Sequence, residues 1–154
     1  MIFKRINRDS PEQIFITVRN GSDTTAFAAG NCCMWDLGAL DGVKVTFIQA
    51  TISEKRTMTF AGIAVQAIAV GEYGLIQVWG FHAGVPVELG ETKSAYTGQP
   101  FYARDVGTMI SLSPQTSGFT GTTWQHELWP GGFLMENYAT SSGTATLAIF
   151  IKAL

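Results

Sequence analysis

Two histidines are the side chains of this chain best suited to general acid–base chemistry. His82 follows a long apolar stretch, and His126 stands directly before Glu127 between two tryptophans. A zinc-protease helix needs a second histidine four residues after the first, and His126 has none there. A small hydrolase would rely on either histidine with a carboxylate, and we keep it as an alternative, although no neighbouring residue completes such a set. We therefore predict that the chain is not an enzyme and has no catalytic residue, metal or cofactor.

The two cysteines and the nearby aspartates have simpler explanations than catalysis. Cys32 and Cys33 are adjacent, and a disulfide between neighbours is strained, so we predict that both are free and reduced. Cys32 could act as a nucleophile only with a distant histidine, and any chain with both residues permits that pairing. Asp36 and Asp41 flank a glycine turn, but a calcium loop has oxygen ligands at closer, alternating positions. We predict a solvated turn there.

An aromatic segment near the C-terminal end is the most pointed feature outside catalysis. Trp124 and Trp129 are followed by Pro-Gly-Gly and then by Phe133. Tryptophans beside Pro and Gly favour a loop or strand tip that presents rings to a partner, either a sugar or a protein. The alternative is that both tryptophans close the end of the fold. We predict that Trp124, Trp129 and Phe133 contact a protein partner.

Residues 1–12 are predicted to form a short N-terminal arm. The arm carries three of the ten basic residues of the chain, mixed with apolar side chains. Such a segment can become ordered on an acidic neighbouring surface. The alternative is a frayed terminus before the first strand. The arm residues predicted to contact a partner are Phe3, Lys4, Arg5 and Arg8.

Composition describes one domain whose surface is poor in charge. The chain has 154 residues, of which 14% are charged, with 17 glycines and a net charge of −2. This length suits a single domain, predicted at residues 13–154. Nucleic acid is not an expected partner because no basic stripe is present, and a membrane is not expected because Glu72 interrupts the longest apolar stretch. Few charges suit a protein whose surface is covered by other protein, because interface cores are depleted in charge.

The apolar stretch 60–80 is predicted to be the central hairpin of the fold. Gly71 and Gly74 bound its only break, and both can adopt the positive φ of a tight turn. Apolar residues occupy both alternating positions of each strand, so we expect both strands to be covered on two faces.

The remaining elements are short strands. Asn20-Gly21 predicts a hairpin with a return strand over 24–29, and 30–42 is expected to hold a short helix or an aromatic-anchored loop. Pro86 lacks a backbone donor and so predicts an edge strand over 85–89. In the last strand, 144–153, the residues predicted to face the core are Leu147, Ile149 and Ile151, with Thr146, Ala148, Phe150 and Lys152 opposite. We predict an all-β fold, an antiparallel sandwich or small barrel in which a jelly-roll-like order is one option.

One segment of the hairpin resembles a known group of proteins. Ala61-Gly62-Ile63-Ala64, Ala67-Ile68-Ala69-Val70-Gly71 and Tyr73-Gly74-Leu75-Ile76-Gln77 followed by Gly80 are similar to a segment of the capsid decoration, or cement, proteins of tailed bacteriophages. The resemblance implies a β-rich virion protein, often trimeric, on the capsid exterior where subunits meet. Its implied partners are the major capsid protein and further copies of itself, with assembly in the host cytoplasm. The alternative is a tail or fibre module that binds host glycans through Trp124 and Trp129.

Overall fold

The structure is a computed structural model that describes residues 12–36, 38–39, 41–46, 60–89, 96–103, 110–112, 131–138 and 143–153. All regular secondary structure in these residues is β-strand, which confirms the all-β prediction. The strands are β1 (Ile14–Asn20), β2 (Cys32–Trp35), β3 (Lys44–Thr46), β4 (Phe60–Ala64), β5 (Tyr73–Leu89), β6 (Pro100–Ala103), β7 (Ile110–Leu112), β8 (Gly132–Leu134) and β9 (Gly143–Lys152).

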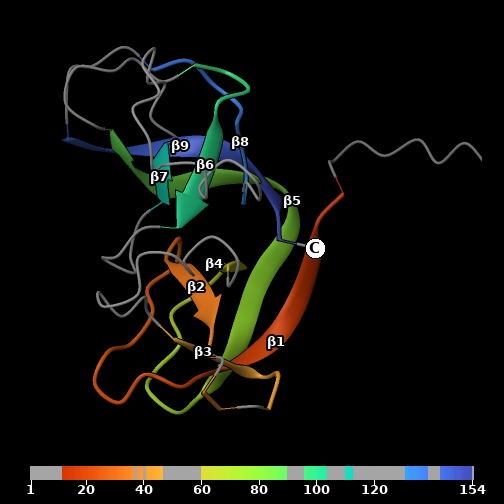
Figure 1. Cartoon of the computed structure of the whole chain (residues 1–154), viewed down its shortest axis with the longest axis vertical. Helices are drawn as coiled ribbons and strands as arrows, with labels where there is room; N and C mark the ends of the chain where they lie inside the picture. Colours follow the sequence, from red (N-terminus) through yellow and green to blue (C-terminus); the bar gives the residue numbers. More distant parts are fainter. Residues whose placement is uncertain are drawn as a thin grey trace, which may run out of the picture.

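The strands close into two rings that share β5. The sheet order is β1-β3-β2-β4-β5-β7-β6-β8-β9, and β5 pairs in addition with β1 and β9. The first ring therefore holds β1, β3, β2, β4 and the start of β5, and the second holds the end of β5 with β7, β6, β8 and β9. Figure 1 shows the two rings at opposite ends of an elongated body, joined by β5. Most pairings are antiparallel, and β1–β3 and β5–β7 are parallel. Ring closure leaves few open sheet edges.

Strand β5 is central along its whole length, because its first half pairs with β1 and β4 and its second half with β9 and β7. The edge strand predicted from Pro86 is therefore wrong. Pro86 pairs with Thr146 of β9, beside a register shift between His82 and Val85. A missing donor is tolerated at such an irregularity, because the regular ladder is already interrupted there.

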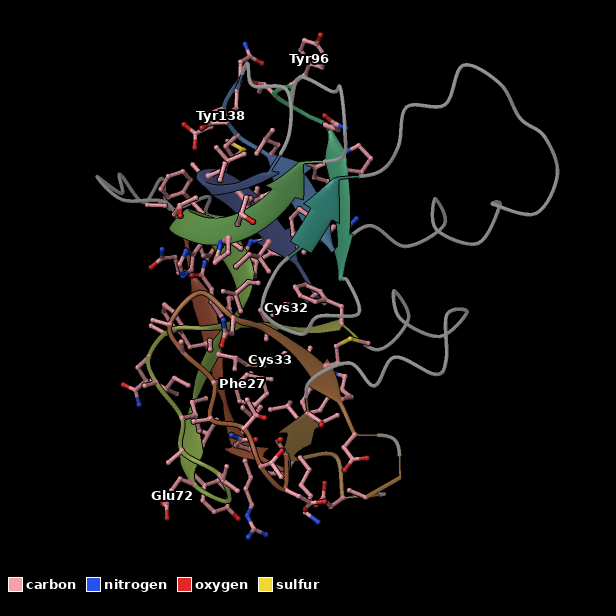
Figure 2. All side chains as sticks on the ribbon, turned by 90° about the vertical axis from the view of Figure 1, so that its left-hand side faces the viewer. Phe27, Cys32, Cys33, Glu72, Tyr96 and Tyr138 are labelled. Atoms are coloured by element: carbon pink, nitrogen blue, oxygen red, sulfur yellow. The ribbon has the colours of Figure 1, made fainter. Side chains whose placement is uncertain are left out.

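Strands β2 and β4 form a wall between two hydrophobic cores. All five residues of β4 are buried, as are the first three of β2. Cys32 belongs to the core of the second ring and Cys33 to that of the first, because successive residues of a strand point to opposite faces. Figure 2 shows both cysteines at the middle of the body. The prediction of two free cysteines is confirmed, and the helix expected within 30–42 is wrong, because β2 occupies that place.

Burial should make both thiols inert in the folded protein. Desolvation raises the pKa of Cys32 and of Cys33 well above the usual range. The unfolded chain loses its thiol protons at a lower pH than the folded chain does. The buried thiols therefore stabilise the folded state below the ordinary thiol pKa of about 8.5, and this stabilisation is lost as the pH rises above that value. We expect a thiol reagent to label neither cysteine in the native protein at pH 8 and both in denaturing urea. Rapid labelling without urea would contradict this burial.

The turn predicted at Asn20-Gly21 is also different from expectation. Instead of a return strand over 24–29, the structure has a loop with a single bridge between Phe27 and Ile68. The buried Asn20 amide donates to the carbonyl oxygens of Thr25 and Ile68, both at 3.0 Å, so it ties two loops to the end of β1. Gly21 donates instead to Val45 of β3 at 2.8 Å.

Candidate docking surface

The outer face of β5 exposes apolar side chains at its start, and Gln77, the polar residue of that face, is buried. Gly74, Ile76 and Val78 point into the first ring, whereas Tyr73 and Leu75 on the other face are 63% and 41% exposed. The expectation that both hairpin strands are covered on two faces thus holds for β4 and is wrong for the start of β5. Apolar residues at both alternating positions here reflect an apolar outer surface, which is typical of sites that bind other molecules.

In the second ring of strands, the same outer face carries a row of aromatic side chains. Cross-strand register places Phe81 of β5 opposite Phe150 of β9, and Phe150 opposite Phe133 of β8. Trp79 packs edge-on against Phe150, with ring centroids 5.2 Å apart and an interplanar angle of 81°. All four side chains are partly exposed, whereas Ile149 and Ile151 on the opposite face are fully buried. We call Trp79, Phe81, Phe133 and Phe150 the aromatic ladder.

Among the described side chains that lie on the same strands and face as the ladder, charged groups are found only at its margins. Lys152 pairs with Trp79 at one end. At the other end, the Glu136 carboxylate accepts a hydrogen bond from the backbone N–H of Ala148, two residues along β9 from Phe150. An uncharged aromatic centre with charged margins is the composition of a protein–protein interface.

The N-terminal arm enters the described structure beside this ladder. The Gln13 side-chain amide donates to the carbonyl oxygen of Phe81 at 2.6 Å. The Gln77 amide donates to the same oxygen and to that of Trp79, both at 3.0 Å. The Gln13 bond joins the residue before β1 to β5 where β5 passes from one ring to the other, and the Gln77 bonds lie within β5.

The sequence-predicted interface residues are only partly described. Phe133 lies on β8 within the aromatic ladder. The other predicted contacts fall outside the described residues: Phe3, Lys4, Arg5, Arg8, Trp124 and Trp129. The sequence prediction placed Phe150 on the non-core face of its strand but did not include Trp79, Phe81 or Phe150 among the interface residues. A signal for Phe150 was available, because it stands on the non-core face of the last strand, where threonines and a lysine are its neighbours.

The candidate catalytic groups form no site within the described residues. His82 is half-buried, desolvation lowers its pKa, and its Nδ1 accepts a hydrogen bond from the N–H of Gly84 at 3.2 Å. His126 lies outside the described residues. In the part of the chain that the structure describes, no cluster of three or more His, Cys, Asp or Glu side chains could hold a metal ion, and no helix could span a membrane.

The two aspartates considered for calcium organise their own turns. Asp36 Oδ1 accepts from the N–H of Gly38 at 3.0 Å, and Asp41 Oδ1 accepts from the N–H groups of Lys44 and Val43. The bonds from Lys44 and Val43 lower the pKa of the exposed Asp41 carboxyl. Both carboxylates therefore act as turn acceptors, in agreement with the predicted solvated turn.

No protein-family model matches this chain, and no curated protein matches it in sequence.

Proposed function

We propose that this chain is a structural, non-enzymatic virion protein that decorates and cements a bacteriophage capsid. In this proposal it binds on the capsid exterior across the boundaries between major capsid protein subunits, as a homotrimer. The aromatic ladder is the observation that carries the proposal. It adds to the resemblance over residues 61–80, which by itself concerns a structural hairpin.

Several properties of the ladder favour a protein partner. Aromatic side chains supply most of the binding energy in interfaces and cluster at their centres. The ladder stands on three adjacent strands of a closed ring, so little conformational entropy is lost when a partner covers it. The predicted arm contacts, Phe3, Lys4, Arg5 and Arg8, belong to the segment that begins beside Phe81. Arm and ladder would thus serve one continuous interface.

The proposed mechanism is thermodynamic linkage. A protein that binds the assembled shell but not free subunits stabilises the shell in proportion to its concentration above the dissociation constant. Each copy adds buried area across a subunit boundary, and no chemical step is required. Two closed rings with separate cores form an elongated body (Figure 1), which is a shape that can bridge two subunits.

Replacing Phe133 by Ser should weaken capsid binding. Removing an aromatic anchor from the centre of an interface costs about 2 kcal/mol, so we expect roughly 30-fold weaker binding. The measurement is co-sedimentation with capsids assembled from the major capsid protein of the same phage. Val70→Ser is the matched control, because Val70 is also exposed but lies in the loop before β5. Equal affinity of the Phe133→Ser, Val70→Ser and unchanged proteins would contradict the role of the ladder.

Exposed aromatic rings also stack on sugars, which keeps the glycan-binding tail module as a second candidate. A glycan array separates the two functions. Binding of a host glycan that is lost in Phe133→Ser or Trp129→Ala, together with no binding to capsids, would favour the tail module. Capsid binding without any bound glycan would favour decoration.

A further inference from the structure

We propose that Asn20 is a site of spontaneous deamidation that the fold protects, so that its side-chain amide is lost only from unfolded chains. Asn20 precedes Gly21, and it is the one asparagine of the chain that is followed by a glycine. This inference goes beyond the proposed function and does not depend on it, because it concerns the chemistry of the chain itself.

The reaction requires only the chain and water. The backbone nitrogen of Gly21, after losing its proton to solvent, attacks the side-chain carbonyl carbon of Asn20. The new carbon–nitrogen bond closes a succinimide ring, the bond to Nδ2 breaks, and ammonia leaves. Water then opens the ring at one of its two carbonyl carbons and yields aspartate or isoaspartate at position 20. Glycine favours ring closure, because no Cβ crowds the attacking nitrogen and its backbone is conformationally permissive.

The folded structure holds both reacting groups in other hydrogen bonds. The buried Asn20 side chain makes three, two donated by Nδ2 and one accepted by Oδ1. The N–H of Gly21 donates to the carbonyl oxygen of Val45 at 2.8 Å. The Gly21 nitrogen must break this bond before it can lose its proton, and the Asn20 amide must break three before it can turn toward that nitrogen. Ring closure in the folded protein is therefore hindered at both reacting groups.

The products do not restore these contacts, because the backbone of Asn20 is bonded as well. Its N–H donates to the carbonyl oxygen of Glu72 at 2.9 Å, and its carbonyl oxygen accepts from the N–H of Gly71 at 3.0 Å. Aspartate keeps this backbone but loses the two bonds of Nδ2. Isoaspartate lengthens the main chain by one methylene carbon, which displaces Gly21 from its partner Val45. Deamidation of the unfolded chain should therefore make unfolding irreversible.

Peptide mass spectrometry measures the reaction. The protein is incubated at pH 8 in native buffer or in guanidinium chloride, and it is digested at acidic pH so that digestion adds no further deamidation. We expect the native protein to lose the Asn20 amide about 1,000-fold more slowly, because a folded domain spends about one part in a thousand of its time or less unfolded. Asn137 is the internal control. It is exposed but precedes Tyr138, whose side chain hinders ring closure, so in guanidinium chloride its amide should outlast that of Asn20.

Gly21→Ala is the matched variant, because it retains Asn20 and slows ring closure. A Cβ on Gly21 would lie 3.3 Å from side-chain carbons of Lys44, and the φ of Gly21 is not in the left-handed region, so the folded state should accommodate it. Both proteins are incubated in guanidinium chloride with a reductant and are then diluted. We expect the unchanged protein to refold less completely than the variant, in step with the loss of its Asn20 amide.

Three results would overturn the proposal. The first is an equal rate of Asn20 deamidation in native buffer and in guanidinium chloride, which needs only the unchanged protein and so holds whether or not the variant folds. The second is loss of the Asn137 amide from the unfolded chain as fast as that of Asn20. The third is complete refolding of chains that carry aspartate or isoaspartate at position 20, with the stability of the unmodified protein.

Discussion

Replacing Gly80 by Ala should destabilise the protein by about 4 kcal/mol, because positive-φ strain and a steric overlap add together. Gly80 has a φ of 99°, a conformation that residues with a Cβ rarely adopt. A Cβ at this position would overlap the carbonyl oxygen of Glu12 and would lie 3.2 Å from the Cα of Gln13. The start of β1 would have to move away, and the Gln13 bond to Phe81 would be lost.

Urea unfolding gives the measurement, and the same strand supplies its control. A Cβ on Gly84 would lie 3.5 Å from the Thr146 side chain, which is ordinary contact. We therefore expect Gly84→Ala to change the free energy of unfolding by less than about 1 kcal/mol. If Gly80→Ala proved as stable as Gly84→Ala, the close approach of the Glu12 carbonyl to Gly80 would be wrong.

Replacing Asn20 by Asp should cost about 3 kcal/mol at pH 7, because it removes the two hydrogen bonds that the Asn20 amide donates and introduces a buried charge. The Asn20 side chain is only 1% exposed. Its Nδ2 donates to Thr25 and Ile68, and its Oδ1 accepts from the N–H of Ser22 at 2.9 Å. A carboxylate retains the last bond and loses the first two.

The pH dependence of this variant provides a second readout. Burial should raise the pKa of the introduced carboxyl, so the folded state takes up a proton more readily than the unfolded state. The deficit relative to the unchanged protein should therefore shrink as the pH falls from 7 towards 5. Asp23→Asn, at an exposed position in the same loop, should have little effect. A deficit that is independent of pH would contradict the burial of Asn20.

Sequence patterns correctly predicted strands that have one face in the core and the other face exposed to solvent. In β9 the alternation identified Leu147, Ile149 and Ile151 as core residues, and all three are buried. Strand β2 was predicted as a helix or loop because both of its faces are buried. Its consecutive residues are therefore all apolar and do not show the apolar–polar alternation of a half-exposed strand. The hairpin expected at Asn20-Gly21 failed because β1 continues into a parallel pair with β3, a long-range contact that outweighs the local turn preference.

The docking surface, too, could be predicted from the sequence only in part. Phe133 was predicted from its place after Pro-Gly-Gly, but its neighbours on the ladder come from β5 and β9, far away in sequence. Only the register of three strands brings Phe81, Phe150 and Phe133 together. An outward apolar residue on a strand is visible in a sequence, but the surface it joins depends on pairing that a single sequence does not specify.

Imaging of capsids incubated with the protein tests the proposed function most directly. We predict that electron cryomicroscopy of capsids incubated with the protein will show added density at boundaries between subunits. In that density the aromatic ladder should contact the shell, and the loop at Glu72, at the far end of the body, should point away (Figure 2). Capsids without added density, or a body attached through the Glu72 end with the ladder facing solvent, would contradict the account.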